Sequence, residues 1–186
     1  MKNIFDITRT IRRFDNAKPI SKETLASVMQ CVTKVASAGN LQRIRYRTVT
    51  GEEAASLFGA VSLGAALPKE KKPTADVAPT AYAVLLTAGE SVDPNLWIDI
   101  GIAAEAIVLS AAAAGIGACI VRNFRADGFA PGTNKEYTPR LVIALGYPAE
   151  RAEIVLVGED GVLKYRKDDD GVNRVPKLSL DSLTVD

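Results

Sequence analysis

The sequence contains no histidine, and this absence excludes several kinds of chemistry. Ser-His-Asp and Cys-His catalysis, most zinc hydrolases and histidine general bases all need an imidazole, which none of the 186 residues supplies. An enzyme built from this chain must therefore obtain its reactivity elsewhere. A bound cofactor provides reactivity that side chains lack, so we expect any catalysis to depend on one.

Cysteine is almost as scarce. The chain has two, Cys31 and Cys119, and each lies in an apolar stretch where buried thiols are common. Two such residues do not make a disulfide framework, which fits a reducing compartment. The first 14 residues also lack an apolar segment followed by a small-residue cleavage site. We therefore expect a cytoplasmic protein.

An excess of charge of one sign is lacking too. The 23 basic and 22 acidic residues leave a net charge of +1, which exerts no general attraction on polyanions, so nucleic acid is not an expected partner. The most apolar segment, residues 100–120, is interrupted by Glu105 and rich in Ala and Gly. It predicts a core helix rather than a membrane span, and no membrane partner is expected.

The length and composition of the chain, with 47% apolar and 24% charged residues, predict one folded domain over residues 1–186. Apolar side chains at helical spacing predict a helix over 21–36, with Ser21 as its N-cap and its end near Gly39 and Asn40. Alternation from Ile44 onward predicts a strand. Arg43, Arg45 and Arg47 share one face of it, either solvated or in contact with a dinucleotide phosphate.

Further along, helices are expected over 52–67 and 100–115, the second with Asp99 as N-cap, Gly115 as its stop and no solvated face. Strands are expected over 80–89, 117–124 and 140–148. The polar tail from Glu150 is not expected to bury itself on its own subunit. Because helices and strands mix without strict alternation, we predict an α+β layered domain.

Two short stretches carry residues suited to ligands. Arg9, Arg12 and Arg13 surround Thr10, and guanidinium and hydroxyl groups match phosphate oxygens; the alternative is a solvated basic turn. "SAGN", residues 37–40, could offer a hydroxyl, an amide and exposed backbone at a helix end, or act as a plain C-cap. We assign Asp99 and Glu105 no catalytic role.

"GIG", residues 115–117, suggests a dinucleotide fingerprint, but here the helix precedes the glycines instead of following them. Gly115 is thus first of all a helix stop. The stretch from Gly117 to Asn123 could still bring strand backbone against a flat ligand.

Taken in order, the motifs resemble those of the FMN-dependent nitroreductase family. They are "RTIRRF" at 9–14, "SAGNLQ" at 37–42, "DIGIAAEAIVLSAAAAGIGACI" at 99–120, "ALGYP" at 144–148 and "VPKL" at 175–178. The resemblance implies a three-layer α-β-α sandwich with a mixed, mainly antiparallel sheet around a central apolar helix. It also implies that a C-terminal extension, about 150–186, embraces a partner subunit.

The same resemblance implies a homodimer with FMN at the subunit interface, reduced by NADH or NADPH and reoxidised by a nitroaromatic, quinone or similar small-molecule acceptor. Its pattern assigns cofactor binding to a set of residues and leaves catalysis to the flavin. They are Arg9, Thr10, Arg12, Ser37, Asn40, Gln42, Gly117, Ile120, Val121, Arg122 and Lys177. Ser37, Asn40 and Gln42 would face the flavin bound mainly by the other subunit. No metal ligand is expected.

Three positions depart from the family pattern. Ala36 and Arg43 stand where proline is common, and Leu178 replaces an expected arginine. Leu178 and Arg43 keep one alternative open, a flavin-binding or sensory protein of the same fold without efficient turnover. A further alternative, a protein that binds a phosphorylated ligand without flavin, rests on the arginine cluster at residues 9–13 alone.

Overall fold

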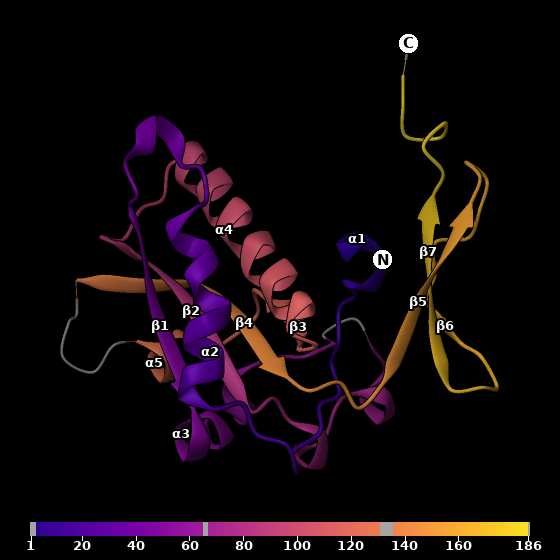
Figure 1. Cartoon of the computed structure of the whole chain (residues 1–186), viewed down its shortest axis with the longest axis horizontal. Coiled ribbons are helices and arrows are strands. Elements are labelled where there is room, and N and C mark those ends of the chain that lie inside the picture. Colours follow the sequence, from indigo (N-terminus) through magenta and orange to yellow (C-terminus); the bar gives the residue numbers. More distant parts are fainter. Residues whose placement is uncertain (1–2, 65–66, 131–135, 186) are drawn as a thin grey trace.

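A four-stranded antiparallel sheet forms the centre of the protein (Figure 1). The computed structural model describes residues 3–64, 67–130 and 136–185. The sheet has the order β1-β2-β4-β3. Its strands are β1 (Ile44–Thr50), β2 (Ala81–Ala88), β3 (Gly117–Val121) and β4 (Tyr137–Gly146). All three strand regions expected after residue 44 thus exist, and the last two are shifted by a few residues.

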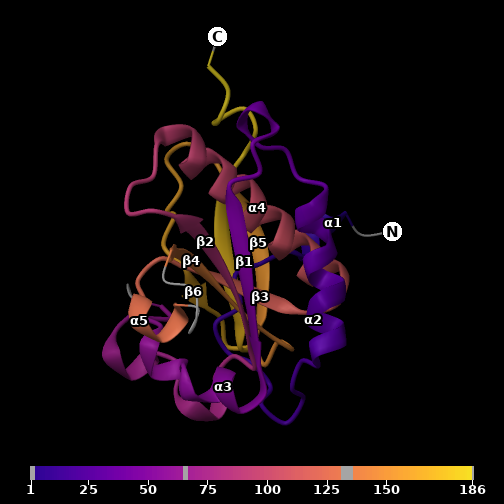
Figure 2. The same cartoon turned by 90° about the vertical axis from the view of Figure 1, so that its left-hand side faces the viewer.

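The sheet is covered on both faces, so its inner strands are buried almost completely. Along β2, Ala83 and Leu85 point into one hydrophobic cluster, whereas Tyr82 and Val84 point into another on the opposite face. This period of two is what strand geometry requires. The expected layered α+β sandwich is confirmed, with helices on each side of the sheet when it is viewed along its edge (Figure 2).

α2 (Lys22–Met29) and α4 (Pro94–Ala113) cover the first face. As predicted, Ser21 caps α2: its hydroxyl accepts a hydrogen bond of 3.1 Å from the Thr24 amide. The helix is shorter than expected, because after Met29 the chain tightens into a 3₁₀ helix (Gln30–Thr33) and then extends. The hydroxyl of Ser110 in α4 donates to the Val28 carbonyl and so satisfies one backbone acceptor at the C-terminal end of α2.

The predicted start of α4 was wrong. Asp93, not Asp99, is the N-cap: its Oδ1 accepts from the Leu96 amide at 3.0 Å, and Pro94 takes the first helical position that suits proline. The predicted stop is confirmed, because Gly115 has φ 71° and the Ile116 amide reaches back to the Ala111 carbonyl at 2.9 Å. That pattern is a Schellman motif.

α4 is not enclosed by its own chain on every side. Ile98 is 61% exposed and Ile102 39% exposed, while Ile100 and Ile107 are buried against the sheet. By length and composition alone α4 could cross a membrane, but 44% of its most apolar window is buried within the protein. A core helix with one uncovered apolar face fits both observations.

The second face is covered by the N-terminal segment and by short helices. They are α3 (Gly51–Ser56), a 3₁₀ helix (Phe58–Ala60) and α5 (Ala126–Phe129), with further 3₁₀ turns at Lys69–Lys71 and Ala75–Val77. α1 (Ile4–Ile7), near the N-terminus, lies instead against α4. The helix expected over 52–67 therefore ends early, and residues 65–66 of that range lie outside the described residues. Glycine lets the N-terminal segment lie close to the sheet, since a Cβ on Gly117 would meet Ile11 at 2.9 Å.

Residues after 150 form a second, three-stranded sheet that projects from the main body (Figure 1). It consists of β5 (Arg151–Val157), β6 (Arg166–Lys167) and β7 (Val172–Leu178) in the order β5-β7-β6, with β5 and β7 parallel. Arg174 pairs with Glu153, Asp168 and Asp170 and holds the sheet together. Val172 and Pro176 are buried, but most of the tail is exposed, in keeping with the expectation for it.

Candidate functional site

Several of the predicted cofactor residues form two groups at opposite ends of α4. Arg9 and Gly117 line a cavity of about 430 Å³ beside its C-terminal end. Ser37, Asn40 and Gln42 belong to a turn that contacts Asp99 near its N-terminal end. Asp99 and the last residue of α4 are separated by about 20 Å at 1.5 Å per residue. The two groups of one chain are therefore far apart.

Backbone pairing positions the first group. Thr10 forms a parallel bridge with Ala118, and the Ile11 amide donates to the Ala118 carbonyl at 2.9 Å. The segment carrying Arg9 thus runs along the free edge of β3, as an added short strand would. Gly117 permits this approach because it has no side chain to collide with Ile11.

Arg9 is the cationic residue best placed for an anion. Its Nη2 donates to the Phe5 carbonyl, but its Nε is buried and has no hydrogen-bond partner. Burial lowers the pKa of this guanidinium, and the nearby Asp6 carboxylate raises it by a smaller amount. A buried donor without an acceptor is unfavourable, and a phosphate or carboxylate oxygen in the cavity would satisfy it. Arg9 is therefore a candidate contact for a phosphate, in a cavity also lined by Arg151 and by the carboxylates of Asp6, Glu150 and Glu153.

Arg12 and Lys177 lie differently from Arg9. The Arg12 guanidinium stands 5.9 Å from the centre of the Tyr165 ring, and neither Arg12 nor Lys177 lines the cavity. The Arg12 amide instead donates to Glu150 Oε1 at 2.6 Å, and Glu150 Oε2 accepts from Asn173. Glu150 thereby joins the N-terminal segment to the C-terminal sheet. The phosphate roles of Arg12 and Lys177 stay predictions.

The second group lies on a strained turn. Gly39, Asn40 and Gln42 have φ values of 56°, 54° and 47°, so the left-handed backbone predicted at Gly39 and Asn40 is confirmed and extends to Gln42. The Ser37 hydroxyl accepts from the Gln42 amide at 3.2 Å, and the Gln42 side chain donates to Asn40 Oδ1 at 3.2 Å. Positive φ at residues other than glycine is unfavourable and concentrates at functional sites.

Asp99 supports this turn, a role that local sequence did not reveal. It is 2% exposed, and its Oδ1 accepts from the Ala38 amide at 2.9 Å. Its Oδ2 is buried without a partner. The sequence does place a carboxylate inside an apolar helix. Burying a charged carboxylate is unfavourable unless it has a hydrogen-bonding partner in the protein or a ligand, and this pattern indicates such a partner.

The outer edge of β3 contains the remaining predicted residues. Ile120 is 45% exposed, Val121 is buried, and the Arg122 guanidinium stands 5.2 Å from the centre of the Trp97 ring. Between the bridge at Ala118 and the end of β3 at Val121, the described part of the chain pairs with this strand through β4 alone, and the next bridge joins Phe124 to Val61. Backbone groups there can meet a flat ligand.

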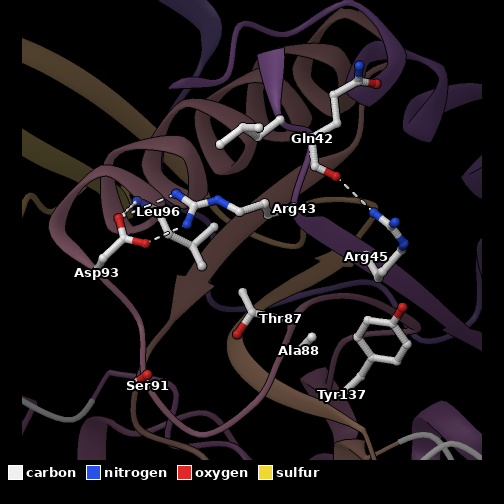
Figure 3. Close-up of a pocket in the computed structure, with 10 residues that line it drawn as sticks. Gln42, Arg43, Arg45, Thr87, Ala88, Ser91, Asp93, Leu96 and Tyr137 are labelled. Atoms are coloured by element: carbon white, nitrogen blue, oxygen red, sulfur yellow. Dashed lines mark hydrogen bonds and ion pairs between the residues drawn. The ribbon is translucent and has the colours of Figure 1, made fainter. Parts of the chain in front are cut away.

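A second cavity, of about 460 Å³, adjoins the strained turn (Figure 3). Gln42, Arg43 and Arg45 line it from the start of β1. Arg43 pairs with Asp93 at 2.5 Å, and this hydrogen bond, together with that from the Leu96 amide, lowers the pKa of Asp93 to about 2. Arg47, further along the strand, pairs with Glu53.

The two thiols take no part in either cavity. Cys31 is half-buried, Cys119 is buried, and neither forms a disulfide. Burial raises the pKa of both thiols, which makes them poor nucleophiles.

Comparison with known proteins assigns the family. The nitroreductase family model matches residues 8–147, which include the main sheet, α4 and both groups of predicted residues. The chain therefore belongs to the nitroreductase family, a class of oxidoreductases. No curated protein matches it significantly.

Solved structures share the fold at low sequence identity. An FMN- and NADPH-dependent nitroreductase, NfnB Y88A, from Sphigopyxis sp. strain HMH is 16% identical, with a TM-score of 0.62 over 78% of this chain and 86% of that one. A nitroreductase family protein from Clostridium novyi NT is 19% identical, with a TM-score of 0.61 over 78% and 83%. Another from Streptococcus pneumoniae TIGR4 is 16% identical, with a TM-score of 0.62 over 80% and 90%. These similarities confirm the fold.

Proposed function

We propose that the protein is an FMN-dependent NAD(P)H oxidoreductase that reduces a nitroaromatic, a quinone or a similar small acceptor. The observation that carries the proposal is the buried, unpartnered Nε of Arg9 in a cavity at the β3 edge. Membership of the nitroreductase family and the absence of histidine support it as well. Two free thiols suit a reducing compartment such as the cytoplasm.

Bound FMN would supply the redox chemistry, accepting a hydride from NADH or NADPH and delivering reducing equivalents to the acceptor. Arg9 and Thr10 would hold the phosphate and ribityl chain, with Arg12 and Lys177 as further cationic contacts. A nearby guanidinium stabilises negative charge that develops on a reduced ring. Backbone from Gly117 to Arg122 would orient the ring without changing protonation state.

We propose that the active unit is a homodimer. The turn with Asn40 and Gln42 lies about 20 Å along α4 from the Arg9 cavity of its own chain. It can therefore complete a site by approaching the Arg9 cavity of another copy. The uncovered Ile98 and Ile102 provide an apolar surface for that contact. Exposed apolar residues of the C-terminal segment would cover part of the partner. They are Leu156, Val162, Leu163, Tyr165, Leu180 and Leu183.

An absorbance spectrum tests this function directly. The purified protein, or the protein incubated with FMN, should show bound-flavin absorbance that bleaches when NADH or NADPH is added without oxygen. A protein that never acquires flavin absorbance would contradict the proposal.

A second candidate is a flavin-binding or sensory protein of the same fold with little turnover. Two observations support it, because each implies weaker binding of the FMN phosphate. Leu178 replaces an arginine, and the Arg12 guanidinium is directed to Tyr165. Such a protein would hold FMN yet resist reduction by either nicotinamide. Steady oxidation of NAD(P)H with a quinone acceptor would exclude it.

A further inference from the structure

The cavity next to the strained turn has an unbalanced charge. Two guanidinium groups, of Arg43 and Arg45, and one carboxylate, of Asp93, line it. Arg43 is neutralised by Asp93 at 2.5 Å. Within the described residues Arg45 has no carboxylate partner. Its Nη1 donates instead to the carbonyls of Gln42 and Ile44, at 2.8 and 3.0 Å. One positive charge therefore remains at the mouth of the cavity.

Neutral hydrogen-bonding groups surround this charge. The Tyr137 hydroxyl points toward Arg45 in Figure 3, and the buried Thr87 also lines the cavity. The Thr87 hydroxyl accepts from Arg140 Nε at 2.9 Å, which leaves its own hydrogen free to donate. Arg140 adds a further positive charge next to Thr87, and its guanidinium also donates to the Gly89 carbonyl at 2.7 Å.

We propose that this cavity binds the anionic group of a substrate, with Arg45 as its cationic contact and Thr87 and Tyr137 as neutral donors. A carboxylate or phosphate accepts hydrogen bonds from such groups and balances the charge of Arg45. A volume of about 460 Å³ is enough for a substituted aromatic ring.

This inference rests on the proposed function, because Gln42 links the cavity to the flavin. Gln42 lines the cavity and is also one of the residues expected to face the ring. An anion held beside Gln42 would keep the rest of the substrate close to the flavin. The cavity thus selects among acceptors, or between NADPH and NADH, by charge.

The experiment uses the holoenzyme and two acceptors of nearly equal shape, 4-nitrobenzoate and 4-nitrobenzamide. Arg45→Ala should raise the KM for 4-nitrobenzoate about tenfold, the loss expected for one charged hydrogen bond, and leave that for 4-nitrobenzamide unchanged. Arg47→Ala is the matched control, because Arg47 lies on the same strand, pairs with Glu53 and does not line the cavity. Calorimetric titration with benzoate should show the same weakening in Arg45→Ala alone.

The outcomes separate this proposal from the proposed function. An effect of Arg45→Ala on the KM for NADPH but not NADH would also support the anion site and assign it to the reductant. Equal KM changes for charged and neutral acceptors, or benzoate binding unaffected by Arg45→Ala, would overturn it. A protein without flavin would refute the proposed function, and benzoate titration would still test the cavity.

Discussion

The amide of Ala38 donates a 2.9 Å hydrogen bond to Oδ1 of Asp99, and this bond attaches the strained turn to the core helix. Gly39, Asn40 and Gln42 all have positive φ, so the turn needs such support to keep its shape. Asp99 acts through the turn and is therefore a positioning residue.

Asp99→Ala should weaken FMN binding and destabilise the fold by about 1 kcal/mol, because it leaves the part-buried Ala38 amide without its acceptor. Asp99→Asn keeps the Oδ1 acceptor and should restore most of the FMN affinity. Flavin fluorescence titration and thermal unfolding of both variants would measure these effects. Similar FMN affinity in the wild type and Asp99→Ala would refute the positioning role.

Arg9→Ala should raise the dissociation constant for FMN tenfold or more, since a charge-assisted hydrogen bond contributes about 1.5–3 kcal/mol. Arg13→Ala is the control, because the Arg13 guanidinium donates to the Lys71 carbonyl and lies outside the cavity. Flavin occupancy after dialysis gives the comparison. Equal occupancy in the two variants would remove the phosphate role of Arg9.

Ile98→Arg should dissociate the proposed dimer, because it places a charge in the centre of the uncovered apolar face of α4. Ala26→Arg, on the exposed side of α2, should have no such effect. Sedimentation velocity at micromolar concentration distinguishes the two states. A wild-type protein that sediments as a monomer would contradict the dimer itself.

Gly117→Ala should destabilise the protein by about 1–3 kcal/mol, because the new Cβ would meet Ile11 side-chain atoms at 2.9 Å. Gly158→Ala, where no atom lies within 4 Å, is the control and should be nearly neutral. Urea unfolding of both variants tests the difference. Equal stability would mean that the N-terminal segment shifts freely along β3.

The Arg43–Asp93 pair predicts an acid-dependent contribution to stability. The folded-state pKa of Asp93, about 2, lies below the ordinary value of 3.8. A depressed carboxylate pKa contributes stability above the unfolded-state pKa and loses it as pH falls toward the folded-state pKa. Asp93→Asn should therefore be less stable than wild type at pH 7, and the gap should shrink between about pH 4 and 2. Unfolding curves across this range would show a constant gap if the pair contributes nothing.

Features set by neighbouring residues could be predicted from sequence. The Ser21 cap, the alternation from Ile44 and the stop at Gly115 each depend on a few adjacent positions. The start of α4 was mistaken because Asp93-Pro94 is also a start signal, and a helix uses the one that its packing allows.

Features set by distant residues could not be predicted in this way. Asp99 meets Ala38 across the fold, and Arg12 turns toward Tyr165 of the C-terminal segment. The parallel pairing of β5 with β7 requires a crossover whose path local patterning does not fix. For the site, the sequence motifs predict a set of residues, whereas the separation of the two groups along α4 follows from the three-dimensional structure.

The bridges from Thr10 to Ala118 and from Phe14 to Pro148 have a consequence for biosynthesis. Ala118 and Pro148 are both made more than 100 residues after their partners in the N-terminal segment, so at ribosomal speed this segment waits on the order of ten seconds for them. During that interval Ile11 and Phe14, both buried in the finished protein, are exposed to solvent and to chaperones. Nascent chains shorter than about 150 residues should thus be unable to close the sandwich.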